Sequence, residues 1–135
     1  MQNNVLGKWE GTYTYLHNDV ENKVGDFILE VTELNDKNQF IGIVIDVIEN
    51  NNSTIRGKFI TPEIEFIKTY NSIKVPIEGK IVNLNTKHHI NYLGDLVNGN
   101  QFFGTWFRKE QKVVYEGKVY TIFSEHGAWS ATRIL

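Results

Sequence analysis

Apolar and polar residues alternate along most of the chain, beginning with the stretch LGKWEGTYTY at residues 6–15. Successive side chains of a strand point to opposite faces, so this stretch has one polar face and one aromatic face. The aromatic face carries Gly7, Trp9, Gly11, Tyr13 and Tyr15. Glycine weakens a strand unless the chain bends or another group comes close. The two glycines among the aromatic residues therefore predict a strongly curved strand.

The period of two recurs at short intervals, and no segment shows the period of a helix. Residues suited to tight turns separate the alternating segments, as in NDKN at 35–38 and NGN at 98–100. We predict eight strands, over residues 6–16, 27–34, 39–48, 54–60, 64–70, 87–93, 102–108 and 128–134. Two segments do not fit eight strands: we expect a short extra strand in 71–86 and a protruding hairpin in 109–125. No internal repeat is strong enough to support a further prediction.

Eight strands joined in sequence by short turns close best into an antiparallel up-and-down barrel, which leaves no exposed sheet edge. We therefore expect an all-β protein with an extra hairpin or strand before the last strand. A two-sheet sandwich is the competing architecture. The 135 residues suffice for one domain, 1–135, whose hydrophobic core is large enough to be stable without disulfides or a structural metal.

Composition excludes several kinds of partner. Fourteen Lys and Arg stand against 16 Asp and Glu, so the chain has no basic footprint for nucleic acid or for an anionic membrane. The sequence has no cysteine and no apolar stretch that could span a bilayer. Its first residues lack the basic and apolar regions of a signal peptide, so we expect no leader. We expect a soluble cytoplasmic protein with no nucleic-acid partner and no membrane insertion.

The stretch GKW at residues 7–9, together with Arg133 in SATRI, resembles the signature of the calycin superfamily, which includes lipocalins, fatty-acid-binding proteins and avidins. The resemblance implies that Trp9 lies inside the closed end of the barrel and that Arg133 packs across it as a structural pair. The motifs IEFIKTY at 64–70 and FFGTW at 102–106 are similar to those of small lipocalin-like barrels. The helices and biotin-binding residues of particular branches are missing, so the resemblance implies the fold and names no ligand.

Alternation anchored on Trp9 predicts which side chains face the interior. Most are apolar, and a polar and aromatic subset lies among them: Asp46, Lys68, Tyr70, His88, Tyr92 and Arg108. Asp46 belongs to this subset only if Gly42 points inward, because both faces of the 39–48 strand are apolar. An unpaired buried charge is costly, so Asp46 and Lys68 should be paired or hydrated.

This subset favours a non-enzymatic barrel that holds a small apolar or amphipathic molecule, with Lys68 and the tyrosines orienting a polar or anionic end. The candidate ligand-binding residues are Tyr13, Tyr15, Asp46, Lys68, Tyr70, Tyr92, Trp106 and Arg108. Each has an alternative structural role. The tyrosines suit strand packing, and the stem of Lys68 can run along the wall to water.

Two other classes of function remain open. The first is an interaction module: the barrel interior is filled, and residues 109–125 form a surface for another protein or for self-association. The second is an enzyme: Asp46, Lys68 and Tyr70 act as acid and base in an isomerase.

We expect no resident cofactor and no metal. His88 and His89 are neighbours on a strand, so they face opposite ways and cannot readily hold one ion. His126 is the candidate haem ligand, because GKWEG is similar to the start of the haem-binding barrels called nitrobindins.

Overall fold

The computed structural model describes residues 4–17, 20–47 and 51–134. These residues contain strands and no helix, so none of them forms a helix that could cross a bilayer. In chain order the strands are β1 (Gly7–His17), β2 (Val20–Leu34), β3 (Gln39–Asp46), β4 (Asn51–Ile60), β5 (Glu63–Tyr70), β6 (Ile73–Ile77), β7 (Lys80–Leu84), β8 (His88–Val97), β9 (Gln101–Arg108), β10 (Gln111–Tyr115), β11 (Lys118–Ile122) and β12 (Glu125–Arg133).

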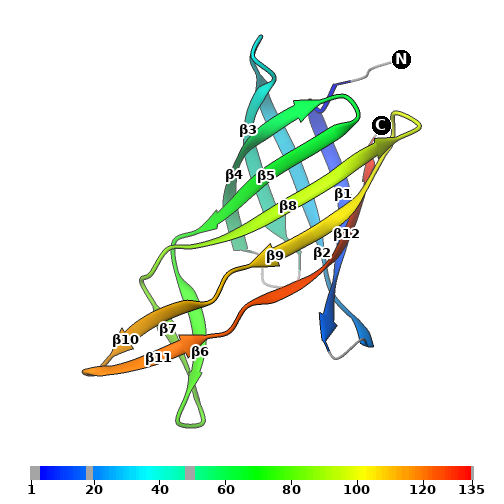
Figure 1. The fold of residues 1–135 in the computed structure, drawn as a ribbon. Helices are drawn as coiled ribbons and strands as arrows, with labels where there is room; N and C mark the ends of the chain where they lie inside the picture. The colour runs from blue at the N-terminus through cyan, green and yellow to red at the C-terminus, as the bar shows by residue number, and fades with distance from the viewer. Residues whose placement is uncertain (1–3, 18–19, 48–50, 135) are drawn as a thin grey trace.

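Eight of these strands close into a barrel in the order β1-β12-β9-β8-β5-β4-β3-β2 (Figure 1). Each barrel strand pairs antiparallel with the next one along the chain, and β1 pairs with β12 to complete the ring. The predicted up-and-down barrel is confirmed, and the alternative of a two-sheet sandwich is wrong. Closure gives every barrel strand two neighbours, which satisfies its backbone hydrogen bonds.

The eight predicted strands correspond to the eight barrel strands, with differences at their ends. β2 begins at Val20, well before the predicted start at residue 27, and β8 continues to Val97. The segment VENKVGD lacks apolar alternation, but it pairs with β1 as far as the His17–Val20 pair. A neighbouring strand that supplies hydrogen bonds extends a ladder that the hydrophobic pattern alone does not reveal. β3 ends at Asp46, and the last residue of the predicted 39–48 strand lies outside the described residues.

The two irregular segments form two hairpins. Residues 71–86 hold β6 and β7, where one extra strand was expected, and the hairpin predicted in 109–125 is β10 and β11. The hairpins are similar in sequence, KVPIEGKIVNL at 74–84 and KVVYEGKVYTI at 112–122. Each turns at a Glu-Gly pair with positive φ, 49° and 79° at Glu78 and Gly79, and 49° and 78° at Glu116 and Gly117. Tight hairpin turns require this left-handed backbone.

The two hairpins leave the same end of the barrel and pack against each other (Figure 1). Their inward side chains form a second hydrophobic core, apart from that of the barrel. Its members are Ile73, Val75, Ile77, Leu84 and Val113, with Val82, Tyr115, Tyr120 and Ile122 packed against them. We call this unit the hairpin pair.

The barrel core confirms the predicted inner face. Trp9, Phe27, Phe66 and Trp129 are each at most 3% exposed, with most of the other predicted apolar residues buried around them. β3 buries Phe40, Gly42, Val44 and Asp46, which decides the facing of that strand. At Gly11 a Cβ atom would overlap the ring of Phe27. The glycine on the aromatic face of β1 therefore makes room for a large neighbour inside the curved wall.

Trp9 and Arg133 meet at the end of the barrel opposite the hairpins. The Arg133 guanidinium lies 4.2 Å from the centroid of the Trp9 ring. Its Nη1 donates to the Leu6 carbonyl at 3.0 Å and its Nη2 to the Asn4 carbonyl at 2.7 Å. Trp9 Nε1 donates to the Val5 carbonyl at 2.9 Å. These contacts fasten the chain before β1 across the barrel end.

Candidate functional site

Inward polar side chains gather at the end of the barrel from which the hairpin pair projects. Asp46 ends β3, Tyr70 ends β5, His88 begins β8 and Arg108 ends β9. Antiparallel pairing brings such strand ends together, and Tyr70 lies directly opposite His88. We call this end the hairpin end of the barrel.

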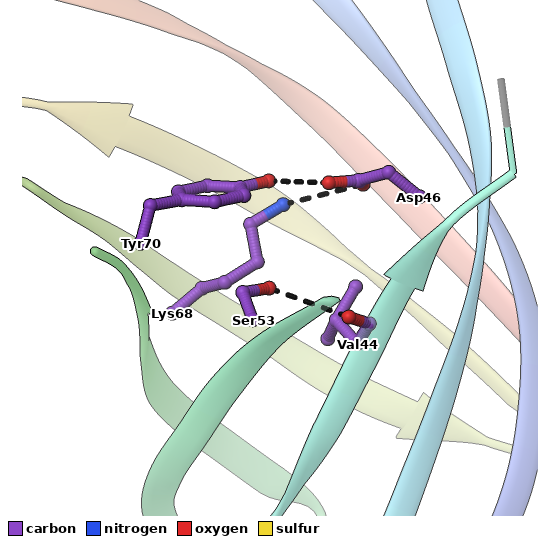
Figure 2. A network of polar contacts seen from close by, with 5 residues as sticks. All are labelled: Val44, Asp46, Ser53, Lys68 and Tyr70. Atoms are coloured by element: carbon purple, nitrogen blue, oxygen red, sulfur yellow. Dashed lines mark hydrogen bonds and ion pairs between the residues drawn. The ribbon is translucent and has the colours of Figure 1, made fainter. Parts of the chain in front are cut away.

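Asp46, Lys68 and Tyr70 form a buried polar cluster, shown in Figure 2. Tyr70 Oη donates a hydrogen bond to Asp46 Oδ2 at 2.6 Å, and Lys68 Nζ lies 3.7 Å from Asp46 Oδ1. Lys68 is 2% exposed and Asp46 is 5% exposed. Replacing a buried ion pair by well-packed apolar residues is often neutral or stabilising. Stability alone therefore does not account for charged groups at this place.

Aromatic rings surround the ammonium group of Lys68. Its Nζ lies 5.6, 5.0 and 5.3 Å from the ring centroids of Tyr13, Tyr70 and Tyr92. These distances are within the range of cation–π attraction, which is stronger where water is excluded. The three rings and the Asp46 carboxylate thus line the place where the Lys68 ammonium group lies inside the barrel.

A second group of rings continues the site along β1 and β9. Trp106 packs edge-on against Tyr15 at 5.1 Å and Tyr13 at 6.4 Å between ring centroids. Its Nε1 donates to the Thr14 carbonyl at 2.9 Å, which fixes the indole orientation. The structure thus joins seven of the eight candidate residues by direct contacts: Tyr13, Tyr15, Asp46, Lys68, Tyr70, Tyr92 and Trp106.

Arg108, the eighth candidate, lies at the rim of the hairpin end. Its Nη2 donates to Glu125 Oε1 at 2.5 Å and more weakly to the Phe123 carbonyl at 3.4 Å. Glu125 is the direct neighbour of Arg108 in the β9–β12 ladder. Glu125 could not be identified from the sequence, because no local pattern pairs it with Arg108 before the strands are placed.

His88 belongs to the site although it was not among the candidate residues. Its ring packs against Tyr70 at 4.8 Å between centroids, and it is 9% exposed. Burial lowers the pKa of His88 to about 4, with further contributions from Arg108, His89 and Lys68. His88 is therefore neutral at pH 7. The sequence pattern that indicates its inward position is the period of two that it shares with Ile90 and Tyr92, which also face inward.

Tyr70 and Tyr92 keep their protons at neutral pH, because the pKa of each is raised. Burial raises the pKa of Tyr70, and the hydrogen bond to Asp46 and the charge of that carboxylate raise it further. Burial followed by the charge of Asp46 also raises the pKa of Tyr92. The site therefore offers phenol groups, a neutral imidazole and an ion pair beside aromatic surfaces.

The barrel is filled beyond this site, toward the end that Trp9 occupies. Phe66 stacks on Tyr92 at 4.6 Å and meets Trp129 at 5.6 Å between ring centroids. Trp129 contacts Phe102 at 5.9 Å, and Phe102 contacts Trp9 at 4.5 Å. The interior between the polar cluster and Trp9 is therefore packed with aromatic rings.

Other candidate groups lie on the outside of the barrel. His126 is exposed on β12 opposite Phe107, so it does not face the interior. His89 is exposed and hydrogen-bonded to Thr69 at 3.0 Å, beside an outer cleft of about 550 Å³ over β3, β4 and β5. Among the described residues, no group of three His, Cys, Asp or Glu side chains could hold a metal ion.

No family model matches this chain, and no curated protein matches its sequence.

Proposed function

We propose that this protein is a calycin-like barrel that binds a small amphipathic molecule at the hairpin end without converting it. The observation that carries the proposal is the Lys68–Asp46–Tyr70 cluster, buried inside the barrel and bordered by aromatic faces. Ligand sites commonly combine apolar walls with a few polar groups that fix orientation. The apolar part of the ligand packs against Tyr15 and Trp106, and its polar end lies at the cluster.

The calycin-like assignment is supported by two features. The barrel has eight antiparallel strands in up-and-down order. Arg133 of the last strand covers Trp9 of the first strand at 4.2 Å. The resemblance of GKW and SATRI to the calycin signature led to the same pair of residues.

Thermal unfolding with a panel of lipophilic probes tests ligand binding, after native mass spectrometry has shown whether a molecule co-purifies. A ligand that binds only the folded state raises stability, and at 100 times its Kd we expect a melting-temperature increase of roughly 5 °C or more. Lys68→Ala should abolish the increase and Tyr70→Phe should reduce it. Each variant is compared with its own ligand-free melting temperature.

Lys58→Ala is the matched control, because Lys58 is an exposed lysine on the outer face of β4. It should keep the full increase. A flat response to every probe, with no co-purified mass, would contradict the proposed function.

A second candidate function is supported by the outer face of the hairpin pair. Ile81, Val114, Val119 and Phe123 are between 63% and 72% exposed, and Val114 lies opposite Val119. Exposed apolar patches and unpaired strand edges favour association. In this candidate the segment 109–125 joins two copies of the chain, and sedimentation at increasing concentration tests it. A monomer at all concentrations would exclude self-association.

A further inference from the structure

We infer that the polar end of the ligand is a neutral hydrogen-bond donor such as a hydroxyl group, and not an anion. This inference rests on the proposed function and specifies the chemical class of the ligand. It follows from the balance of charge in the polar cluster and from the atoms there that make no hydrogen bond.

Lys68 and Arg108, the two cations of the site, each lie beside a carboxylate group. Lys68 Nζ is 3.7 Å from Asp46 Oδ1, and Arg108 Nη2 is hydrogen-bonded to Glu125. A ligand carboxylate beside Lys68 would place a second negative charge next to Asp46. Like charges in a poorly hydrated site repel strongly, so one of them would have to take up a proton. The cluster is therefore a poor receptor for an anion.

The unused hydrogen-bonding capacity points to a donor. Asp46 Oδ1 and His88 Nδ1 are buried atoms that make no hydrogen bond with any described residue. Nearly all buried polar atoms in proteins have such a partner. A carboxylate oxygen can only accept, and the neutral His88 imidazole accepts at Nδ1 when its proton is on Nε2.

Tyr70 connects these two residues. Its hydroxyl group is bound to Asp46, and its ring packs against His88 at 4.8 Å. A hydroxyl group has one hydrogen, so a ligand hydroxyl beside Tyr70 would donate either to Asp46 Oδ1 or to His88 Nδ1. A hydroxyl oxygen also accepts, which suits Arg108 Nε, a buried donor without a hydrogen-bond partner among the described residues.

The test compares three probes with the same ten-carbon chain at pH 7.5 by isothermal titration calorimetry: 1-decanol, decyl methyl ether and decanoate. The alcohol has a donor, the ether has only an acceptor, and decanoate has a negative charge. We expect 1-decanol to bind at least about tenfold more tightly than either of the others, since a hydrogen bond to a charged group is worth more than one to a neutral group. The ether is the more apolar probe, so weaker binding of it cannot reflect hydrophobicity.

Asp46→Asn gives a second test. It removes the negative charge that lies 3.7 Å from Lys68 Nζ and would repel a ligand carboxylate, so the preference should shift toward decanoate. Asp95→Asn is the matched control, because Asp95 is exposed on β8, and it should keep the wild-type order of affinities. The comparison of the three probes on the wild-type protein is decisive even if Asp46→Asn does not fold.

The outcomes separate the two proposals. Equal affinity for the alcohol and the ether, or tighter binding of decanoate to the wild type, would overturn the donor inference and leave ligand binding intact. Failure of all three probes to bind, together with a flat thermal-shift panel, would overturn the proposed function itself.

Discussion

Within β5 the inner face changes character over a few residues. Phe66 packs among Tyr92, Trp129 and Phe40, whereas Lys68, two positions later, is surrounded by three tyrosine rings and one carboxylate. All these side chains share one face because successive strand residues alternate. The boundary between the filled core and the polar site therefore lies between Phe66 and Lys68, two successive inward-facing residues of β5.

His88 makes the stability of the protein depend on pH. Its folded pKa of about 4 is below the ordinary histidine value of 6.5, mainly because it is buried. Between these two values the unfolded chain binds a proton that the folded protein does not, so stability falls as the pH drops from 6.5 toward 4. We expect a loss on the order of 1 kcal/mol from this group after solvent screening.

Urea denaturation of His88→Gln at pH 7.5 and pH 5 measures this contribution. The variant should lose less stability between the two pH values than the wild type does. His89→Gln is the matched control, because His89 is the next residue and is exposed on the opposite face. Equal pH dependence in wild type and His88→Gln would show that His88 is not the group responsible.

The hairpin pair is an element with a core of its own. Its buried residues are a separate cluster from those of the barrel. Local units with independent cores can open without global unfolding. We therefore expect the hairpin pair to unfold locally while the barrel stays folded.

Two neighbouring valines test this independence. Val113 is 3% exposed in the hairpin core, whereas Val114 is 68% exposed on the outer face. Val113→Asp buries an unpaired charge and should raise the amide hydrogen exchange of β6, β7, β10 and β11 by about tenfold or more. Val114→Asp should leave exchange there unchanged.

Barrel amides, as in β3 and β4, should keep their protection in both variants. If Val113→Asp unfolded the whole barrel, the two cores would be one cooperative unit. If it left the hairpin strands as protected as before, the second core would contribute nothing to their stability.

Across the whole molecule, closure depends on contacts between the two ends of the chain. β1 pairs with β12 from the Trp9–Arg133 pair to the Tyr15–Gly127 pair. Arg133 adds hydrogen bonds to Leu6 and Asn4 and covers the Trp9 ring. One side chain thus fastens three segments at the end of the barrel.

Arg133→Ala removes the hydrogen bonds to Leu6 and Asn4 and the contact with the Trp9 ring. We expect it to lower the free energy of unfolding by roughly 2 kcal/mol or more, because a stacked, charged donor with two carbonyl partners is lost. Arg56→Ala is the matched control, since Arg56 is exposed on the outer face of β4, and it should change stability by less than about 0.5 kcal/mol. Chemical denaturation measures both. A loss for Arg133→Ala as small as that of the control would show that the barrel closes without this residue.

Much of the barrel could be predicted from the order of residues. Alternation predicted the eight strands and the inward facing of Lys68, Tyr70, His88 and Tyr92, because a strand has only two faces and a water-excluding interior selects one of them. The start of β2 could not be predicted, since its polar residues are held by pairing with β1. The hairpin of β6 and β7 was predicted as a single strand, although its sequence is similar to that of β10 and β11.

Except in β3, where both faces are apolar, the sequence by itself determined which side chains face inward, since that depends on local alternation and on the cost of burying polar surface. Only the tertiary structure decided which of them touch. Asp46 and Tyr70 are 24 residues apart in the chain, yet they share a 2.6 Å hydrogen bond. Arg108 joins Glu125, and two distant hairpins share a core. These contacts depend on ring closure and on the register between strands, and no local pattern encodes the distance between two strand ends.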